Sequence, residues 1–196
     1  LHSYPTRGHI SGAYDSTVGL ISLGMVGRRV VQLLKSFDLH VLAYDPFVGR
    51  EDAAALGVEL CSLDDLFQRA DVVSLHTPWL PGTEGMITGA HLASMKPYTT
   101  FINTARGAVV REDEMIEVLQ ARPDLCAVLD VTYPEPPAPE SRLYTLPNVV
   151  LTPHIAGAMG AECRRLGRSM VDELRRYLAG EPLRWGIDER RAALLA

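Results

Sequence analysis

The chain has 196 residues, 47% hydrophobic and 22% charged, so it can bury the core of one large domain or of one domain plus a fragment of another. Its net charge is −5 and it has no basic block, which argues against nucleic acid as a partner because phosphates are neutralised by clustered Lys and Arg. It has no run of 18 apolar residues and no secretion leader, so we expect no membrane partner and a cytoplasmic location. Cys61, Cys126 and Cys163 are odd in number and lack metal-ligand spacing, so we expect neither disulfides nor a metal site.

The first 16 residues show little periodicity and are expected to form a lead-in rather than a domain. From residue 17 onward, apolar runs of strand length alternate with amphipathic stretches, which predicts an α/β fold with a doubly wound parallel sheet. Ser62 and Thr88 each precede an amphipathic stretch and are predicted to be helix N-caps. The expected strands are 18–23, 39–44, 58–61, 71–75, 100–103, 126–130 and 149–152. The expected helices are 25–36, 50–56, 63–70, 89–95 and 112–121.

The segment from Val18 to Val30, VGLISLGMVGRRV, predicts a buried strand, a tight turn at Gly24 and a helix with Gly27 on its first turn. Such a turn suits a dinucleotide, because its backbone can approach a pyrophosphate closely and the helix N-terminus offers free N–H groups. Ser22 stands where the usual G-x-G-x-x-G pattern has its first glycine. The two remaining glycines could therefore also serve only the tight packing of a parallel α/β unit.

Asp45 follows the second expected strand and lies 18 residues after Gly27. This is close to the spacing of about 20 at which an acidic side chain binds the hydroxyls of the adenosine ribose. Asp45 could also be a turn residue before Pro46, and the two interpretations are compatible. Together, the turn and Asp45 favour a Rossmann-type dinucleotide-binding domain over residues 17–157.

The last expected helix runs from Ala161 to Ala179 and stops at Gly180. Its apolar residues fall on one face of the helix: Leu166, Met170, Val171, Leu174, Tyr177 and Leu178. Its arginines lie largely elsewhere: Arg164, Arg165, Arg168, Arg175 and Arg176. These arginines could bind an anion, but acidic residues are interleaved with them, which favours a solvated face.

Three loops that follow later strands carry unusual polar residues, and the carboxyl ends of parallel strands are where ligands bind in an open α/β sheet. Arg106 follows the strand at 100–103, where its guanidinium can grip a carboxylate bidentately. Glu135 lies in the Pro-rich stretch 133–139, which we interpret as a wall of an active site rather than a polyproline ligand. His154 follows the last strand and is suited to proton transfer near neutral pH. Taken singly, Arg106 could pair with any surface acid, Glu135 could be solvated and His154 could be structural.

At this point the sequence resembles the D-isomer-specific 2-hydroxyacid dehydrogenase family over residues 16–183. The resemblance rests on an ordered set of motifs, which is far more specific than any single motif. The set comprises the nucleotide turn, YDP at 44–46, HTP at 76–78, INTARG at 102–107, the spacing from Asp130 to Glu135, and TPHIAG at 152–157.

The resemblance implies that Arg106 holds the carboxylate of a small 2-keto or 2-hydroxy acid, that His154 is the general acid and base, and that Glu135 supports His154. It also implies an NAD-dependent oxidoreductase that acts as a homodimer. The residues that correspond to cofactor contacts in the family are Gly24, Met25, Val26, Gly27, Asp45, Thr77, Pro78, Thr104, Ala105, Arg106, Asp130, His154 and Gly157. Asp45 would repel a 2′-phosphate and the next three residues offer no cation, which favours NAD over NADP.

Family members carry most of their substrate domain before the nucleotide domain, whereas here only 16 residues precede it. We therefore expect most of the substrate domain to be absent from this chain, and residues 158–196 to return toward it. Some proteins that resemble this family act as corepressors, so the alternative function is a non-catalytic NAD(H)-sensing scaffold.

Overall fold

A computed structural model describes residues 12–192, so most of the expected lead-in lies outside the described residues. The chain forms two compact units, of which the first ends at Pro153 and the second begins at His154. The boundary suggested by the sequence lies after Gly157, four residues further along the chain. The two units are described separately below.

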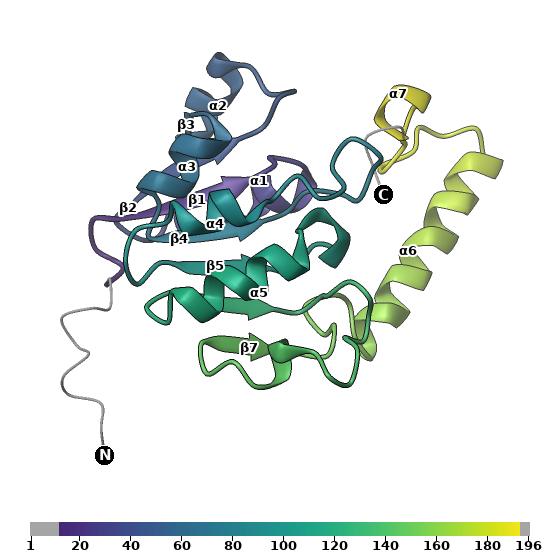
Figure 1. Cartoon of the computed structure of the whole chain (residues 1–196). Helices are drawn as coiled ribbons and strands as arrows, with labels where there is room; N and C mark the ends of the chain where they lie inside the picture. The colour runs from purple at the N-terminus through teal and green to yellow at the C-terminus, as the bar shows by residue number, and fades with distance from the viewer. Residues whose placement is uncertain (1–11, 193–196) are drawn as a thin grey trace. The chain divides into compact units, whose positions relative to one another are not determined.

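Within the described part of the first unit, seven parallel strands form one sheet with the order β3-β2-β1-β4-β5-β6-β7 (Figure 1). This arrangement confirms the predicted doubly wound parallel sheet, and every strand lies within two residues of its predicted bounds. The strands are β1 (Ser16–Ile21), β2 (Leu39–Tyr44), β3 (Glu59–Leu60), β4 (Val72–Leu75), β5 (Thr100–Asn103), β6 (Cys126–Leu129) and β7 (Val149–Leu151).

Helices lie on both faces of the sheet, and each face has its own hydrophobic cluster. On one face, Phe67, Leu92 and Leu119 pack from three helices around Phe101 of β5. On the other face, Val31 packs with Leu20 of β1. Figure 1 shows α4 and α5 side by side in front of the sheet. The helices are α1 (Met25–Leu34), α2 (Arg50–Leu56), α3 (Leu63–Arg69), α4 (Gly89–Ala93) and α5 (Glu112–Ala121).

Two predicted helix N-caps are confirmed. The Ser62 hydroxyl accepts from the Asp65 amide at 3.1 Å, and the Thr88 hydroxyl accepts from the His91 amide at 3.5 Å. Three short elements were not predicted, because each is only a turn of helix without its own apolar period: η2 (Gly107–Val109), η3 (Arg142–Tyr144) and α7 (Glu189–Ala192).

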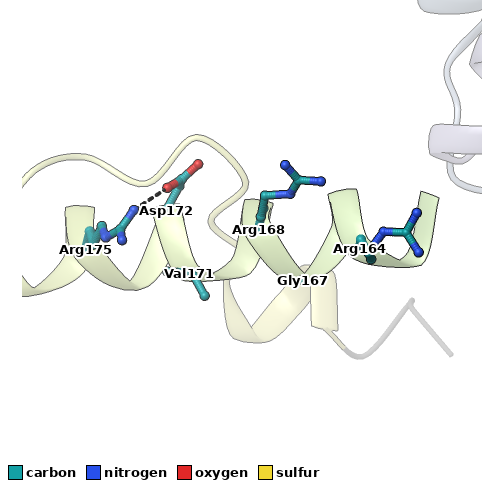
Figure 2. A pocket seen from close by; sticks show the side chains of 6 residues that line it. All are labelled: Arg164, Gly167, Arg168, Val171, Asp172 and Arg175. Atoms are coloured by element: carbon teal, nitrogen blue, oxygen red, sulfur yellow. Dashed lines mark hydrogen bonds and ion pairs between the residues drawn. The ribbon is translucent and has the colours of Figure 1, made fainter. Parts of the chain in front are cut away.

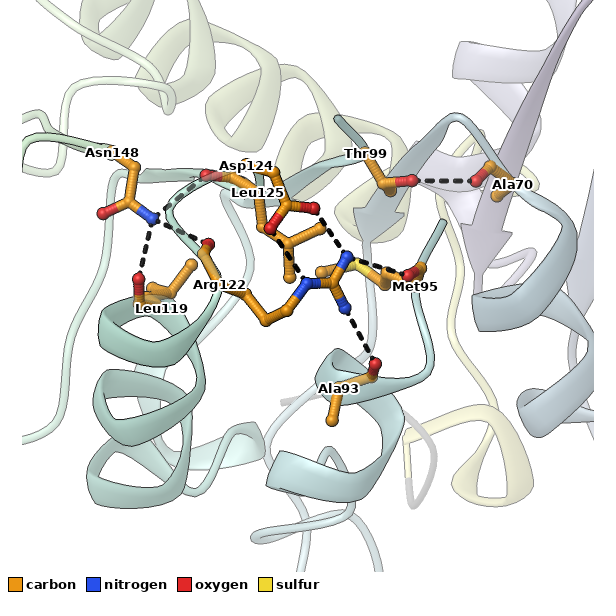
Figure 3. Close-up of polar contacts among 9 residues, drawn as sticks. All are labelled: Ala70, Ala93, Met95, Thr99, Leu119, Arg122, Asp124, Leu125 and Asn148. Carbon is orange, nitrogen blue, oxygen red and sulfur yellow. Dashed lines mark hydrogen bonds and ion pairs between the residues drawn. The ribbon is translucent and has the colours of Figure 1, made fainter. Parts of the chain in front are cut away.

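At the amino ends of the strands, side chains bind main-chain carbonyls and tie neighbouring elements together (Figure 3). The Asn148 amide nitrogen donates to the carbonyls of Leu119, Arg122 and Leu125 at 2.9–3.3 Å. The Arg122 guanidinium donates to the carbonyls of Ala93, the last residue of α4, and Met95, and it pairs with Asp124 at 2.6 Å. We call Thr99, Arg122, Asp124 and Asn148 the amino-edge bracket.

The second unit contains α6 (Ala161–Leu178), an amphipathic helix with no buried residue. Its apolar face is exposed, with Leu166 and Leu174 more than half accessible. Figure 2 shows the residues that line a pocket on α6, and two of them, Arg175 and Asp172, form a 3.0 Å ion pair. One helix cannot enclose a ligand, so this side of α6 fits the predicted solvated face. No helix in the described part of the chain is long and apolar enough to cross a membrane.

Candidate active site

The turn between β1 and α1 begins at Ser22, two residues before the predicted position. Ser22 has a φ of 79°, a left-handed conformation that ends β1 at Ile21 and that a glycine would adopt at less cost. Its hydroxyl makes a 2.8 Å hydrogen bond with the Thr77 hydroxyl, and its amide donates to the Tyr44 carbonyl. Ser22 therefore adopts a conformation suited to glycine, and its hydrogen bonds anchor the turn to β2 and to the loop after β4.

The two glycines of the turn differ in what surrounds them. A Cβ on Gly27 would lie 2.2 Å from the Ser22 carbonyl oxygen, so packing of α1 against the turn excludes any larger residue. A Cβ on Gly24 would meet nothing within 4 Å, and Gly24 has an ordinary negative φ. Packing within the chain thus explains Gly27 but not Gly24. Open space at the N-terminus of α1 is what a bound pyrophosphate requires.

Asp45 lies next to this turn, because Tyr44 of β2 is in register with Ile21 of β1. Its two carboxylate oxygens accept from the Leu23 amide at 2.7 Å and from the Phe47 amide at 2.8 Å. Both interpretations of Asp45 are therefore compatible in the structure. Each oxygen keeps a second lone pair, which leaves the carboxylate able to bind ribose hydroxyls. Met25 and Val26 expose more than 60% of their surface at the start of α1.

Thr77 and Pro78 follow β4, the strand beside β1 on the side where the strand order reverses. Ligands in doubly wound sheets bind at this switch point. Thr77 is buried and also contacts the Ile21 carbonyl through its hydroxyl, whereas Pro78 is half-buried. Burial lowers the pKa of the adjacent His76 below its ordinary value of 6.5.

The loop after β5 is organised by Asn103, a residue to which the sequence assigned no role. The Asn103 side chain is buried, donates to the Arg106 carbonyl at 3.0 Å and accepts from the Ala105 amide at 3.0 Å. Thr104 and Arg106 are exposed at the tip of this loop. A Cβ on Gly107 would lie 2.1 Å from the Thr132 backbone, so this loop packs directly on the loop after β6.

The loop after β6 starts at Asp130, which is buried and accepts a hydrogen bond from the Thr152 hydroxyl. The Asp130 amide donates to the Asn103 carbonyl at 2.9 Å. Further along, the Tyr133 amide donates to a carboxylate oxygen of Glu112 at 3.0 Å. Burial raises the pKa of Glu112, and this hydrogen bond partly opposes the rise. Glu135 is exposed in the same loop.

The remaining two predicted site residues, His154 and Gly157, belong to the second unit. His154 is exposed and has a φ of 51°. This left-handed conformation is uncommon outside glycine, and residues that adopt it cluster at functional sites. A Cβ on Gly157 would meet nothing within 4 Å. The structure thus brings the predicted site residues of the first unit, from Gly24 to Glu135, to one edge of the sheet.

A parallel sheet in this strand order, with an open glycine turn after β1 and an acid after β2, defines a dinucleotide-binding domain of the Rossmann type. Residues 3–156 match the family described as D-isomer specific 2-hydroxyacid dehydrogenase, NAD binding domain. The chain belongs to this family, and its cofactor is NAD.

The chain is 42% identical over 178 residues to a D-3-phosphoglycerate dehydrogenase of Mycobacterium tuberculosis, a match that covers 89% of this chain and 33% of that protein. It is similar to the apo structure of the Rhodotorula graminis D-mandelate dehydrogenase, with a TM-score of 0.80 at 29% identity, over 91% of this chain and 53% of the other. An NAD-complexed D-isomer specific 2-hydroxyacid dehydrogenase of Lactobacillus delbrueckii ssp. bulgaricus gives a TM-score of 0.77 at 30% identity, over 91% and 58%. The chain thus spans between a third and about three fifths of the length of these three proteins.

Proposed function

We propose that this chain is the NAD-binding part of an oxidoreductase that transfers a hydride between NAD(H) and a small 2-hydroxy or 2-keto acid. In this proposal Arg106 holds the substrate carboxylate, His154 is the general acid and base, and Glu135 supports His154. Residues 158–196 lead back toward the substrate domain. The whole protein forms a homodimer, which sedimentation velocity would test.

The observation that carries the proposal is the exposure of Arg106 on a loop that is fixed by its contacts. Its guanidinium is exposed, yet the loop that bears it is fixed by the buried Asn103 and by the close contact of Gly107 with Thr132. A rigid loop that presents a permanently charged, bidentate donor suits recognition of a carboxylate. The same edge of the sheet carries the turn at Gly24, so the cation and the dinucleotide turn would line one wall of the proposed cleft.

The residues of the chain then have separate tasks. Bound NADH supplies the hydride that reduces the ketone carbon. The Arg106 guanidinium orients the acid through its carboxylate, which converts an encounter into a reaction between positioned groups. The His154 imidazole donates a proton to the ketone oxygen during reduction and takes it back during oxidation. The Glu135 carboxylate supports His154 by accepting a hydrogen bond from the other nitrogen of its imidazole.

Steady-state NADH oxidation with a panel of 2-keto acids tests the proposal. It should be measured on the 196-residue chain and on the protein including any segment upstream of Leu1. We expect the short chain to bind NADH but to turn over little substrate, because it encodes only one wall of the cleft. Tight NADH binding with no turnover of any keto acid by the longer protein would instead favour an NAD(H)-sensing scaffold. Comparable turnover by the short chain would show that the two-domain organisation is wrong.

A further inference from the structure

Two exposed aromatic side chains meet at the carboxyl ends of the strands. Trp79 follows β4 and Tyr133 follows β6, and their rings make an edge-to-face contact with centroids 5.4 Å apart. Trp79 remains 41% exposed and Tyr133 remains 52% exposed. The two residues are 54 positions apart in the sequence, yet their rings contact each other and both stay partly exposed. The pair therefore has apolar surface available for a ligand.

Carboxylates bind the Trp79 side chain and the Tyr133 backbone, and the contact between the two rings orients the Tyr133 side chain. The Trp79 indole nitrogen donates to Glu84 at 3.0 Å, and the Tyr133 amide donates to Glu112 at 3.0 Å. Fixed aromatic side chains lose little conformational entropy when a ligand packs on them. The pair is therefore organised before any ligand arrives.

The pair flanks the loop that bears Arg106. Trp79 and Tyr133 come from the loops after β4 and β6, and β5 lies between these two strands. Gly107 packs directly on the Thr132 backbone, one residue from Tyr133. A 2-keto acid whose carboxylate binds Arg106 would thus extend its side chain close to these rings.

The two loops offer no Lys or Arg to a second anionic group on that side chain. Residues 76–88 and 130–141 contain no Lys or Arg, but they contain Glu84, Asp130, Glu135 and Glu140. Arg111 reaches the first loop, where it donates to the Gly85 carbonyl and pairs with Glu114 at 3.0 Å. A phosphate, sulfonate or second carboxylate would find no cation from these two loops to pair with, which would weaken its binding.

We propose that Trp79 and Tyr133 determine substrate specificity, and that the substrate is a 2-keto or 2-hydroxy acid with a neutral aromatic side chain. This proposal rests on the proposed function.

Competition among three keto acids tests the proposal on the protein including any upstream segment. We expect kcat/KM to fall in the order phenylpyruvate, pyruvate, 3-phosphohydroxypyruvate. Trp79→Ala and Tyr133→Ala should each lower the ratio of kcat/KM for phenylpyruvate over pyruvate by roughly tenfold or more, the scale at which apolar pockets discriminate. Phe37→Ala, an exposed aromatic before β2 at the opposite edge, should leave the ratio unchanged.

A binding measurement keeps the proposal testable without turnover. The chain has two tryptophans, so Trp185→Phe leaves one indole N–H signal in NMR, that of Trp79. Adding 3-phenyllactate to the NADH complex of this variant should shift the Trp79 signal saturably, and lactate should shift it much less. A preference for 3-phosphohydroxypyruvate, an unchanged substrate ratio in both alanine variants, or an unmoved Trp79 signal would overturn the specificity proposal. Failure of every keto acid to react, with the Trp79 shift intact, would instead count against the proposed function alone.

Discussion

The two edges of the sheet use polar side chains in opposite ways. At the amino edge, Asn148 and Arg122 bind main-chain carbonyls, and the Asp71 carboxylate accepts from the Thr17 amide and pairs with Lys96. At the carboxyl edge, a Cβ on Gly24 would meet nothing within 4 Å, and Arg106 is exposed on a fixed loop, where its guanidinium donates to the Ala105 carbonyl at 2.7 Å. Polar groups that satisfy the backbone stabilise the fold, whereas polar groups held open by a rigid frame can bind a ligand. The difference predicts that substitutions at the two edges have separable effects.

The largest effect is expected at His154. In the protein including any upstream segment, His154→Ala should lower kcat by roughly a hundredfold or more, the scale of a lost general acid. Arg106→Ala should act chiefly by raising KM for the keto acid, with kcat also reduced. Steady-state kinetics separates the two variants, and unchanged kinetics in both would rule out the proposed mechanism.

The two glycines of the β1–α1 turn provide a matched pair. Gly27→Ala places a Cβ 2.2 Å from the Ser22 carbonyl oxygen, and this overpacking should destabilise the fold by about 2 kcal/mol or more. Gly24→Ala should leave the free energy of unfolding nearly unchanged but weaken NADH binding by roughly tenfold or more, because the new methyl group occupies the pyrophosphate approach.

Urea denaturation and calorimetric titration of NADH measure both quantities for each glycine variant. Equal NADH affinity for Gly24→Ala and the unmodified chain would show that the open space at this turn is not a ligand site.

Substitutions in the amino-edge bracket should change the stability of the fold but not the affinity for NADH. Asn148→Ala removes the donor shared by three carbonyls, so the free energy of unfolding should fall by about 2 kcal/mol. The NADH dissociation constant, measured well below the melting temperature, should stay within about twofold because the bracket lies at the other end of the strands. A large change in NADH affinity would contradict the proposal that the two edges have separate roles.

A smaller effect is expected at Asp45, whose charge should repel the 2′-phosphate of NADPH. Asp45→Asn removes that charge and should narrow the preference for NADH over NADPH by roughly tenfold, measured as a ratio of dissociation constants. Asp38→Asn changes an acid that precedes β2, at the opposite end of the same strand, and should leave the ratio unchanged. Tighter binding of NADPH than NADH by the unmodified chain would contradict the assignment.

The smallest effect concerns pH. Burial holds the pKa of His76 below 6.5 in the folded chain, so as pH falls below 6.5 the unfolded chain takes up this proton first. The contribution to stability is fully present above that pH and is lost as pH falls through the lower, folded pKa. In His76→Gln the free energy of unfolding should therefore decline less between pH 7 and pH 5. The free energy of unfolding is measured by urea denaturation at each pH. An equal decline in the two proteins over this range would show that His76 does not titrate as described.

Regular elements with a sharp apolar pattern were predictable from the sequence. The bounds of α2, α5 and β5 are those predicted, because each has a clear apolar period and polar or Gly/Pro residues at its ends. Strand β1 was placed two residues late, since the sequence does not reveal that Ser22 adopts a left-handed conformation. That conformation depends on contacts with Thr77 and Tyr44, which are distant in sequence.

The site residues were predictable from the sequence only where a single loop contains a recognisable motif. Motifs located the turn at Gly24 and the loop with Arg106, and the structure places both at the carboxyl edge. Asn103 was missed because its role arises from bonds within a folded loop and to the neighbouring β6 loop. The contact of Trp79 with Tyr133 was missed for a similar reason, as it joins loops that only the strand order brings together.

The most direct test of the difference between the edges is an amide NMR titration of the 196-residue chain with NADH. We predict shifts for residues 22–27, 45–48, 76–79 and 103–107, which lie at or just beyond the carboxyl ends of β1, β2, β4 and β5. We predict little change for residues 97–99, 122–125 and 146–148, which lie before the amino ends of β5, β6 and β7. Shifts concentrated in the amino-edge residues, or no saturable shifts near Gly24, would contradict the account.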